Sequence, residues 1–147
     1  MRIESLYIDG FGHFAQHTFG PFDAPITIFE GENEAGKTTL LAFIRTILFG
    51  FPTRGRDEHY PPSKGGKHGG HIVVVDDDCT RYTVERYAGA RGGTLSVKDD
   101  SGNSYGEADL KQLVGHSSKE LFENVFAFGL DELQEMKSLD NEEVQGR

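Results

Sequence analysis

ITIFEGENEAGKTTLLAFIRTILFG, residues 26–50, joins a short apolar run, a loop bounded by glycines and a segment with an apolar helical face. The loop fits the pattern G-x-x-x-x-G-K-[ST], in which Gly31 and Gly36 let the backbone curl so that successive N–H groups point at phosphate oxygens. A helix that begins near Lys37 presents the positive end of its dipole to the same anion. Because a strand-like run precedes the loop and a helical pattern follows it, this stretch predicts a phosphate-binding loop.

Two side chains of the loop predict what is bound there. The ammonium group of Lys37 is expected to reach the β- and γ-phosphates of a nucleotide, and the hydroxyl of Thr38 is expected to ligate Mg²⁺. The predicted cofactors are therefore ATP and Mg²⁺, with Thr38 as the metal ligand.

Length, charge and cysteine content narrow the class of protein. The 147 residues are enough for one domain, and a formal net charge of -9 argues against a domain that holds nucleic acid by bulk electrostatics. No apolar run approaches membrane-spanning length, and MRIESLYIDGF lacks the order of a signal peptide. The single Cys79 excludes an internal disulfide and, with His68 and His71, fits no common zinc spacing. We expect a cytoplasmic protein.

Apolar periodicity predicts an α/β fold, with a mixed sheet around the phosphate-loop helix and an antiparallel β-subdomain. Turn residues between alternating segments predict hairpins, and Gly50 and Pro52 are expected to end the helix. Residues 52–70 hold no apolar period and are expected to form a long loop. The predicted strands are 2–8, 13–19, 25–31, 71–75, 81–87, 93–99, 104–106 and 125–128, and the predicted helices are 38–49, 107–114, 118–123 and a segment from about 131.

The acidic segment HIVVVDDD, at residues 71–78, looks like the Walker B strand that completes the metal site in many phosphate-loop proteins. A Walker B strand is central, parallel and followed by a crossover, whereas VVVDDDCTRYTVERY turns back within a few residues. We therefore favour a hairpin with Asp77 and Asp78 in its turn. The alternative, in which Asp76 or Asp77 binds Mg²⁺, stays open at this point.

Four stretches carry a family resemblance: the phosphate loop, GFGHF, LFGFP and VFAFGLDELQ. The chain resembles the N-terminal lobe of an SMC-like, AAA/ABC-class ATPase of the SbcC type, and among these ATPases it is most similar to the YhaN group. The resemblance implies a single N-terminal nucleotide-binding lobe over residues 1–147, with a coiled-coil helix starting at about 131. In that family a C-terminal lobe of the same chain supplies Walker B, so its absence here is expected. The nucleotide-binding residues that the resemblance implies are Gly31, Asn33, Glu34, Ala35, Gly36, Lys37, Thr38 and Thr39.

Two positions depart from the family pattern. Relatives often place an arginine after the first strand, where it contacts nucleotide, and GFGHF offers Gly12 there. Relatives also carry a glutamine after the last strand of the lobe, whereas VFAFGLDELQ has Phe128 and Gly129, with Gln134 farther along. Both departures bear on hydrolysis more than on nucleotide binding.

The resemblance implies the ATP-binding half of an ATPase head that acts in DNA repair or DNA organisation. The implied partners are the C-terminal lobe of the same parent protein, a second head in an ATP-dependent dimer, DNA and a nuclease, with no membrane. We expect the isolated chain to bind ATP without turning it over, and no catalytic residue is assigned within it. Two alternatives stay open: a self-contained small P-loop phosphotransferase, and a non-catalytic module whose interactions depend on nucleotide.

Overall fold

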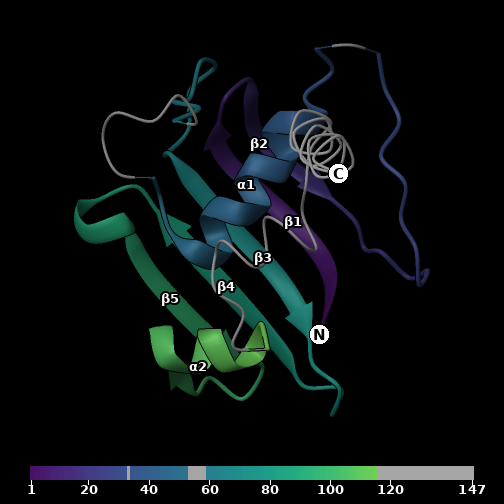
Figure 1. Cartoon of the computed structure of the whole chain (residues 1–147), viewed down its shortest axis with the longest axis vertical. Coiled ribbons are helices and arrows are strands. Elements are labelled where there is room, and N and C mark those ends of the chain that lie inside the picture. Colours follow the sequence, from purple (N-terminus) through teal and green to yellow (C-terminus); the bar gives the residue numbers. More distant parts are fainter. Residues whose placement is uncertain (33, 53–58, 116–147) are drawn as a thin grey trace, which may run out of the picture. The chain divides into compact units, whose positions relative to one another are not determined.

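An antiparallel sheet of six strands forms the body of the chain (Figure 1). The computed structural model describes residues 1–32, 34–52 and 59–115, all within the unit Met1–His116. The strand order is β2-β1-β3-β4-β5-β6. The elements are β1 (Arg2–Phe11), β2 (Phe14–Phe19), α1 (Lys37–Phe49), β3 (Gly69–Val75), β4 (Arg81–Tyr87), the 3₁₀ turn η1 (Ala90–Gly92), β5 (Thr94–Asp99), β6 (Ser104–Tyr105) and α2 (Glu107–Leu113).

One face of the sheet is apolar because alternate residues of a strand point to the same side. The register pairs Leu6 with Ile72, Ile72 with Val84, and Val84 with Val97, so one row of buried side chains crosses four strands. On β3 and β4 the residues immediately before and after this row along each strand are less buried than the row itself. This row forms the floor of the core.

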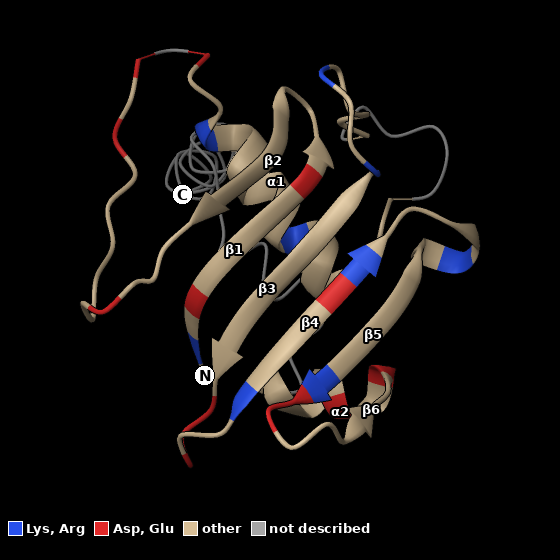
Figure 2. Ribbon diagram, turned by 180° about the vertical axis from the view of Figure 1, so that it is seen from behind, with Lys and Arg blue, Asp and Glu red and all other residues tan. Residues whose placement is uncertain are grey.

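Helix α1 covers the apolar face of the sheet (Figure 1), and no described helix covers the opposite face (Figure 2). Its buried side chains include Leu40, Phe43 and Ile47, which share one side of the helix. The rings of Phe43 and Phe11 meet edge to face with their centroids 5.5 Å apart. Burial of one such side chain contributes about 1.5–3 kcal/mol, so these contacts fix α1 over β3 and β4.

Most predicted elements within the described residues are confirmed. The helix predicted at 38–49 is α1, and the strands predicted at 2–8 and 13–19 are present as β1 and β2. The predicted antiparallel hairpins are β3 to β6, and the helix predicted at 107–114 is α2. The elements predicted at 118–123, at 125–128 and from about 131 lie outside the described residues.

The strand predicted at 25–31 is wrong for this structure, because these residues form an irregular segment. Ile26 and Ile28 are 78% and 83% exposed. A strand is stable where a neighbour satisfies its N–H and C=O groups, and no described strand pairs with this segment. For the same reason the described residues do not form the expected mixed sheet; their ladders are antiparallel, and their only parallel pairing is one bridge between Gly10 and His68.

The buried guanidinium group of Arg86 on β4 joins both helices to the sheet. Its Nε donates to the carbonyl of Ile47, in the last turn of α1, at 3.0 Å. Its Nη1 donates to the carboxylate of Glu107, the first residue of α2, at 2.8 Å. Arg86 is 1% exposed and Glu107 is 57% exposed. Because a buried cation without a counter-charge is costly, we infer that Glu107 is needed for stability even though it faces water.

Removal of Glu107 is predicted to destabilise the fold more than removal of a carboxylate from a solvent-exposed ion pair. Glu107→Ala leaves the Arg86 charge buried and unpaired, and we expect the free energy of unfolding to fall by about 2–4 kcal/mol. Urea denaturation followed by circular dichroism measures this loss. The control is Glu4→Ala, which breaks the more exposed pair between Glu4 and Arg81 and should cost much less.

A second substitution separates charge from packing in the same experiment. Adding Arg86→Met to Glu107→Ala removes the uncompensated charge and should recover part of the lost stability. No recovery in the double variant, or equal losses in Glu107→Ala and the Glu4→Ala control, would contradict this account.

Candidate functional site

The loop before α1 ends in a backbone conformation that favours glycine. Gly36 has a φ of +99°, and its carbonyl accepts the N–H of Leu40 at 2.8 Å, which starts the helix. No side chain caps this end of α1, and its first turn holds no acidic residue. Since the first N–H groups of a helix have no intrahelical partner, this end of α1 offers donors and a positive dipole to an anion.

The ammonium group of Lys37 binds carbonyls of its own loop. Its Nζ donates to the carbonyl of Gly31 and, at 2.8 Å, to the carbonyl of Glu32. Both acceptors are neutral, and an ionised phosphate is a stronger acceptor for the same ammonium group. The lysine can therefore exchange these partners for a phosphate.

A hollow with a volume of about 340 Å³ opens at this end of α1. Of the eight predicted nucleotide-binding residues, five lie in its wall. Gly31 and Ala35 do not line it, and Asn33 lies outside the described residues. The residues that line it are His13, Glu34, Gly36, Lys37, Thr38 and Thr39.

The donors around this hollow fit a phosphate chain with a bound metal ion. The free N–H groups and Lys37 are donors for anionic oxygens. Thr38 is exposed in the first turn of α1 and supplies one hydroxyl oxygen. Mg²⁺ usually takes few protein ligands and completes its shell with water and phosphate oxygens, so a single hydroxyl is sufficient for such a site.

Sequence reasoning missed His13, which comes from the turn between β1 and β2 rather than from the loop. A Cβ built on Gly36 would lie closer than 3.0 Å to the ring atoms Cε1 and Nε2 of His13. The ring therefore lies directly against the end of the phosphate loop. The available signal was the turn GFGHF, in which a histidine directly follows Gly12.

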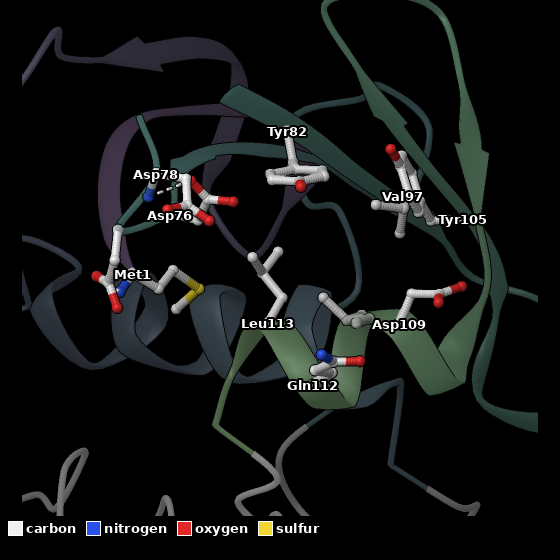
Figure 3. A pocket seen from close by; sticks show the side chains of 11 residues that line it. Met1, Asp76, Asp78, Tyr82, Val97, Tyr105, Asp109, Gln112 and Leu113 are labelled. Atoms are coloured by element: carbon white, nitrogen blue, oxygen red, sulfur yellow. Dashed lines mark hydrogen bonds and ion pairs between the residues drawn. The ribbon is translucent and has the colours of Figure 1, made fainter. Parts of the chain in front are cut away.

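The favoured interpretation of the acidic segment as a hairpin is confirmed. β3 and β4 are antiparallel, and Val75 pairs with Arg81, so Asp76 lies in the turn between them. One oxygen of Asp76 accepts the N–H groups of Asp78 and Thr80, both at 2.9 Å. Figure 3 shows this turn at the edge of a separate pocket of about 370 Å³ that Tyr82 and residues of α2 also line.

The turn at Asp76 is far from the phosphate loop. Arg2, at the start of β1, pairs with Val75, whereas His13 follows the other end of β1 and contacts Gly36. Ten residues of strand separate the two sites, which corresponds to roughly 30 Å. Asp76 and Asp77 therefore cannot share a metal ion with Thr38, and the alternative in which they bind Mg²⁺ beside the nucleotide is wrong.

His68 and His71 pack against different aromatic rings. The ring of His68 packs against those of Phe11 and Phe51, whereas the ring of His71 stacks on Tyr7. Burial lowers the pKa of both imidazoles and so favours their neutral forms. Across residues 1–32, 34–52 and 59–115 no cluster of His, Cys, Asp or Glu is arranged to hold a metal ion.

An apolar groove of about 500 Å³ lies along the segment that leads into the phosphate loop. Its wall includes Pro25, Thr27 and Phe29 from this segment and Ile44 from α1. The intervening residues of the segment, which include the exposed Ile26 and Ile28, do not line the groove. The segment thus keeps the alternation of an extended chain: the groove-lining Phe29 is 39% exposed, whereas Ile26 and Ile28 on the other side are far more exposed.

Two comparisons with known proteins agree with this geometry. A family model described as an AAA domain matches residues 1–138. The chain is 33% identical over 144 residues to the protein of Bacillus subtilis (strain 168) called "Uncharacterized protein YhaN". The match covers 98% of this chain and 14% of that relative.

Within the described residues, no helix is long and apolar enough to cross a membrane.

The family match covers more than half of the chain and includes the phosphate loop. The predicted resemblance to an AAA-type ATPase lobe of the YhaN group is therefore confirmed, and the chain belongs to the AAA domain family.

Proposed function

We propose that this chain is the ATP-binding N-terminal half of an SMC-like ATPase head, which hydrolyses ATP only with a C-terminal lobe of the same parent protein. ATP and Mg²⁺ are the proposed cofactors, held by the loop from Gly31 to Thr39 with Thr38 on the metal ion. One observation carries the proposal: α1 is preceded by an apolar segment that pairs with no strand of the described residues.

The exposed segment at residues 25–30 has the side-chain pattern of a strand but pairs with no described strand. Ile26 and Ile28 are on one side of it and face water, whereas Thr27 and Phe29 line the groove on the other side. Burial of an isoleucine side chain contributes about 1.5–3 kcal/mol, and pairing would satisfy the backbone groups as well. Any strand that pairs with this segment would supply both contributions, and we propose that this strand belongs to a second lobe.

The length of the relative supports the same proposal. This chain matches 14% of the length of the B. subtilis protein, so that relative has ample additional sequence for a second lobe. We propose that the parent of this chain is similarly long and that its C-terminal lobe supplies the acidic strand missing from the hollow at α1.

Hydrolysis needs more than the groups around this hollow. Phosphoryl transfer requires a positioned water molecule and stabilisation of charge on the transferred group. Among the described residues that line the hollow, Glu34 is the single carboxylate, and it belongs to the loop itself. The turn at Asp76 is at the far end of β1, which removes the support for a self-contained phosphotransferase.

For the parent protein we propose an ATP-dependent dimer of two heads that acts on DNA in the cytoplasm, in repair or organisation, with a nuclease as a possible partner. The resemblance to SMC-like ATPases supports this part of the proposal. The net charge of -9 indicates that other parts of the assembly supply most of the DNA contact.

Substitution of Lys37 should weaken nucleotide binding. Lys37→Ala removes a charge from the phosphate site, and we expect the Kd for Mg²⁺-ADP to rise about ten- to hundredfold in calorimetry. Asp76→Asn is the matched control, because asparagine keeps the oxygen that accepts the two turn N–H groups, and it should bind as the wild type does. Equal affinity of Lys37→Ala and wild type, or loss of Mg²⁺-dependent binding in Asp76→Asn, would contradict the assignment of the site.

The isolated chain should hold ATP without hydrolysing it at an appreciable rate. Steady-state phosphate release by the chain is expected to stay within a few-fold of the Lys37→Ala control, because no second lobe orients water or stabilises the transferred phosphoryl group. Addition of the C-terminal lobe of the parent should restore Lys37-dependent turnover and cause dimerisation with ATP. Strong Lys37-dependent turnover by the chain alone would refute the two-lobe proposal. ATP-driven dimerisation without turnover, even with both lobes present, would favour a non-catalytic module.

A further inference from the structure

A pocket of about 370 Å³ lies between the turn that follows β3 and helix α2, at the other end of β1 from the phosphate loop (Figure 3). Its volume is within the range of ordinary small-molecule sites. None of its lining residues lines the hollow at α1. We propose that this pocket binds a linear diamine of the polyamine class, with an ammonium group at each end and the methylene chain between them. The inference goes beyond the proposed function and does not depend on it.

The middle of the pocket is apolar and aromatic. Val97 and Leu110 in its wall are 2% and 1% exposed. The rings of Tyr82 and Tyr105 meet edge to face with their centroids 5.4 Å apart, and Leu113 of α2 points toward Tyr82 (Figure 3). Burial of methylene groups against such a surface is favourable, and the face of a tyrosine ring also attracts an ammonium group. This section therefore suits an alkyl chain that carries positive charge at its ends.

Carboxylates lie at two ends of the apolar section. Figure 3 shows Asp76 and Asp78 of the turn at one end and Asp109 of α2 at the other end. One oxygen of Asp76 accepts two N–H groups of its turn, and one oxygen of Asp109 accepts the N–H of Gly106 at 2.8 Å. A carboxylate can accept about four hydrogen bonds on its two oxygens, so both groups keep capacity for a ligand. Two anionic ends with an apolar middle match a ligand with two cationic ends.

The charge of the pocket is not balanced by its own wall. The residues that line it, all of them described, include four aspartates but no lysine, arginine or histidine. Arg81, which follows the turn, binds Glu4 and Asp100 and does not line the pocket. The amine of Met1 donates to Asp77 at 3.1 Å while Met1 also lines the pocket. Met1 thus shows one ammonium group bound at this wall, and the other carboxylates remain for a ligand.

A diamine fits this pocket better than an inorganic cation does. Within residues 1–32, 34–52 and 59–115 no group of His, Cys, Asp and Glu is arranged to hold a metal ion. A small inorganic cation would also leave the apolar middle unused. A chain with a net charge of -9 attracts cations in general, but this attraction is screened beyond about 8 Å at physiological ionic strength. Binding that persists at this ionic strength therefore reports on the pocket itself.

The test measures the Kd of putrescine, cadaverine and hexamethylenediamine by calorimetry on the full 147-residue chain at physiological ionic strength. The diamine that binds most tightly is then compared with the monoamine of the same chain length. We expect the monoamine to bind at least about tenfold more weakly, because one carboxylate end is left without an ammonium group. Mg²⁺ at the same concentration should not displace the diamine.

Three results of these titrations would overturn the inference. The first is that none of the three diamines binds saturably. The second is equal affinity for the diamine and its monoamine, and the third is displacement of the diamine by Mg²⁺. The last two results would mean that the acidic surface attracts any cation, without use of the apolar middle or of both ends.

Substitutions at the two ends locate the bound diamine. Asp78→Asn and Asp109→Asn each remove one charge from one end, and the asparagine at position 109 keeps an oxygen for the N–H of Gly106. Each should raise the Kd of the diamine about five- to tenfold. Asp100→Asn is the matched control, because it removes the same charge from the turn after β5, outside the pocket, and should bind as the wild type does.

The comparison with the control decides the location. A loss of affinity in Asp100→Asn as large as that in Asp78→Asn and Asp109→Asn would overturn the inference, because net charge alone would then explain binding. If circular dichroism shows that Asp109→Asn is unfolded, Asp78→Asn in the turn decides. Weaker diamine binding in Asp78→Asn than in Asp100→Asn supports the inference, and equal binding in these two variants overturns it.

Discussion

The packing of α1 on the buried row of the sheet is the constraint on which the site depends. Phe43 and Ile47 must leave water, and the surface that accepts them is the row that includes Ile72 and Val84. With the helix there, its N-terminus lies beside the turn between β1 and β2. The phosphate loop therefore lies against His13 because Phe43 and Ile47, several residues farther along α1, are buried against the sheet.

The two ends of α1 are fixed by different means. At its C-terminal end Arg86 binds the carbonyl of Ile47 and connects the helix to α2 through Glu107. At its N-terminal end the turn at Gly12 contacts Thr39 and is itself held by the loop at Tyr60. A helix fixed at both ends presents its free N–H groups in a constant direction, which is what preorganised binding of an anion requires.

Local patterns were sufficient to predict most of the fold but not the contacts between distant segments. The hairpin at Asp76 was predictable because its turn residues and the short return of the chain are local features. The segment at Ile26 and Ile28 has the alternating pattern of a strand, yet such a pattern does not show whether a neighbouring strand exists to pair with it. The approach of His13 to Gly36 and the burial of Arg86 depend on how α1 lies on the sheet. The spacing of residues in the sequence predicts neither of these contacts.

The central claim is that the segment before the phosphate loop, which pairs with no strand among residues 1–32, 34–52 and 59–115, pairs with a strand of a second lobe in the complete head. Amide hydrogen exchange at residues 26–30 measures this directly, because an unpaired backbone exchanges rapidly and a paired strand does not. In the isolated chain these amides should exchange at close to the rate of an unstructured peptide while those of β3 are protected. In the parent protein the same amides should be protected to a degree similar to β3. Protection already present in the isolated chain, or rapid exchange in both proteins, would contradict the account.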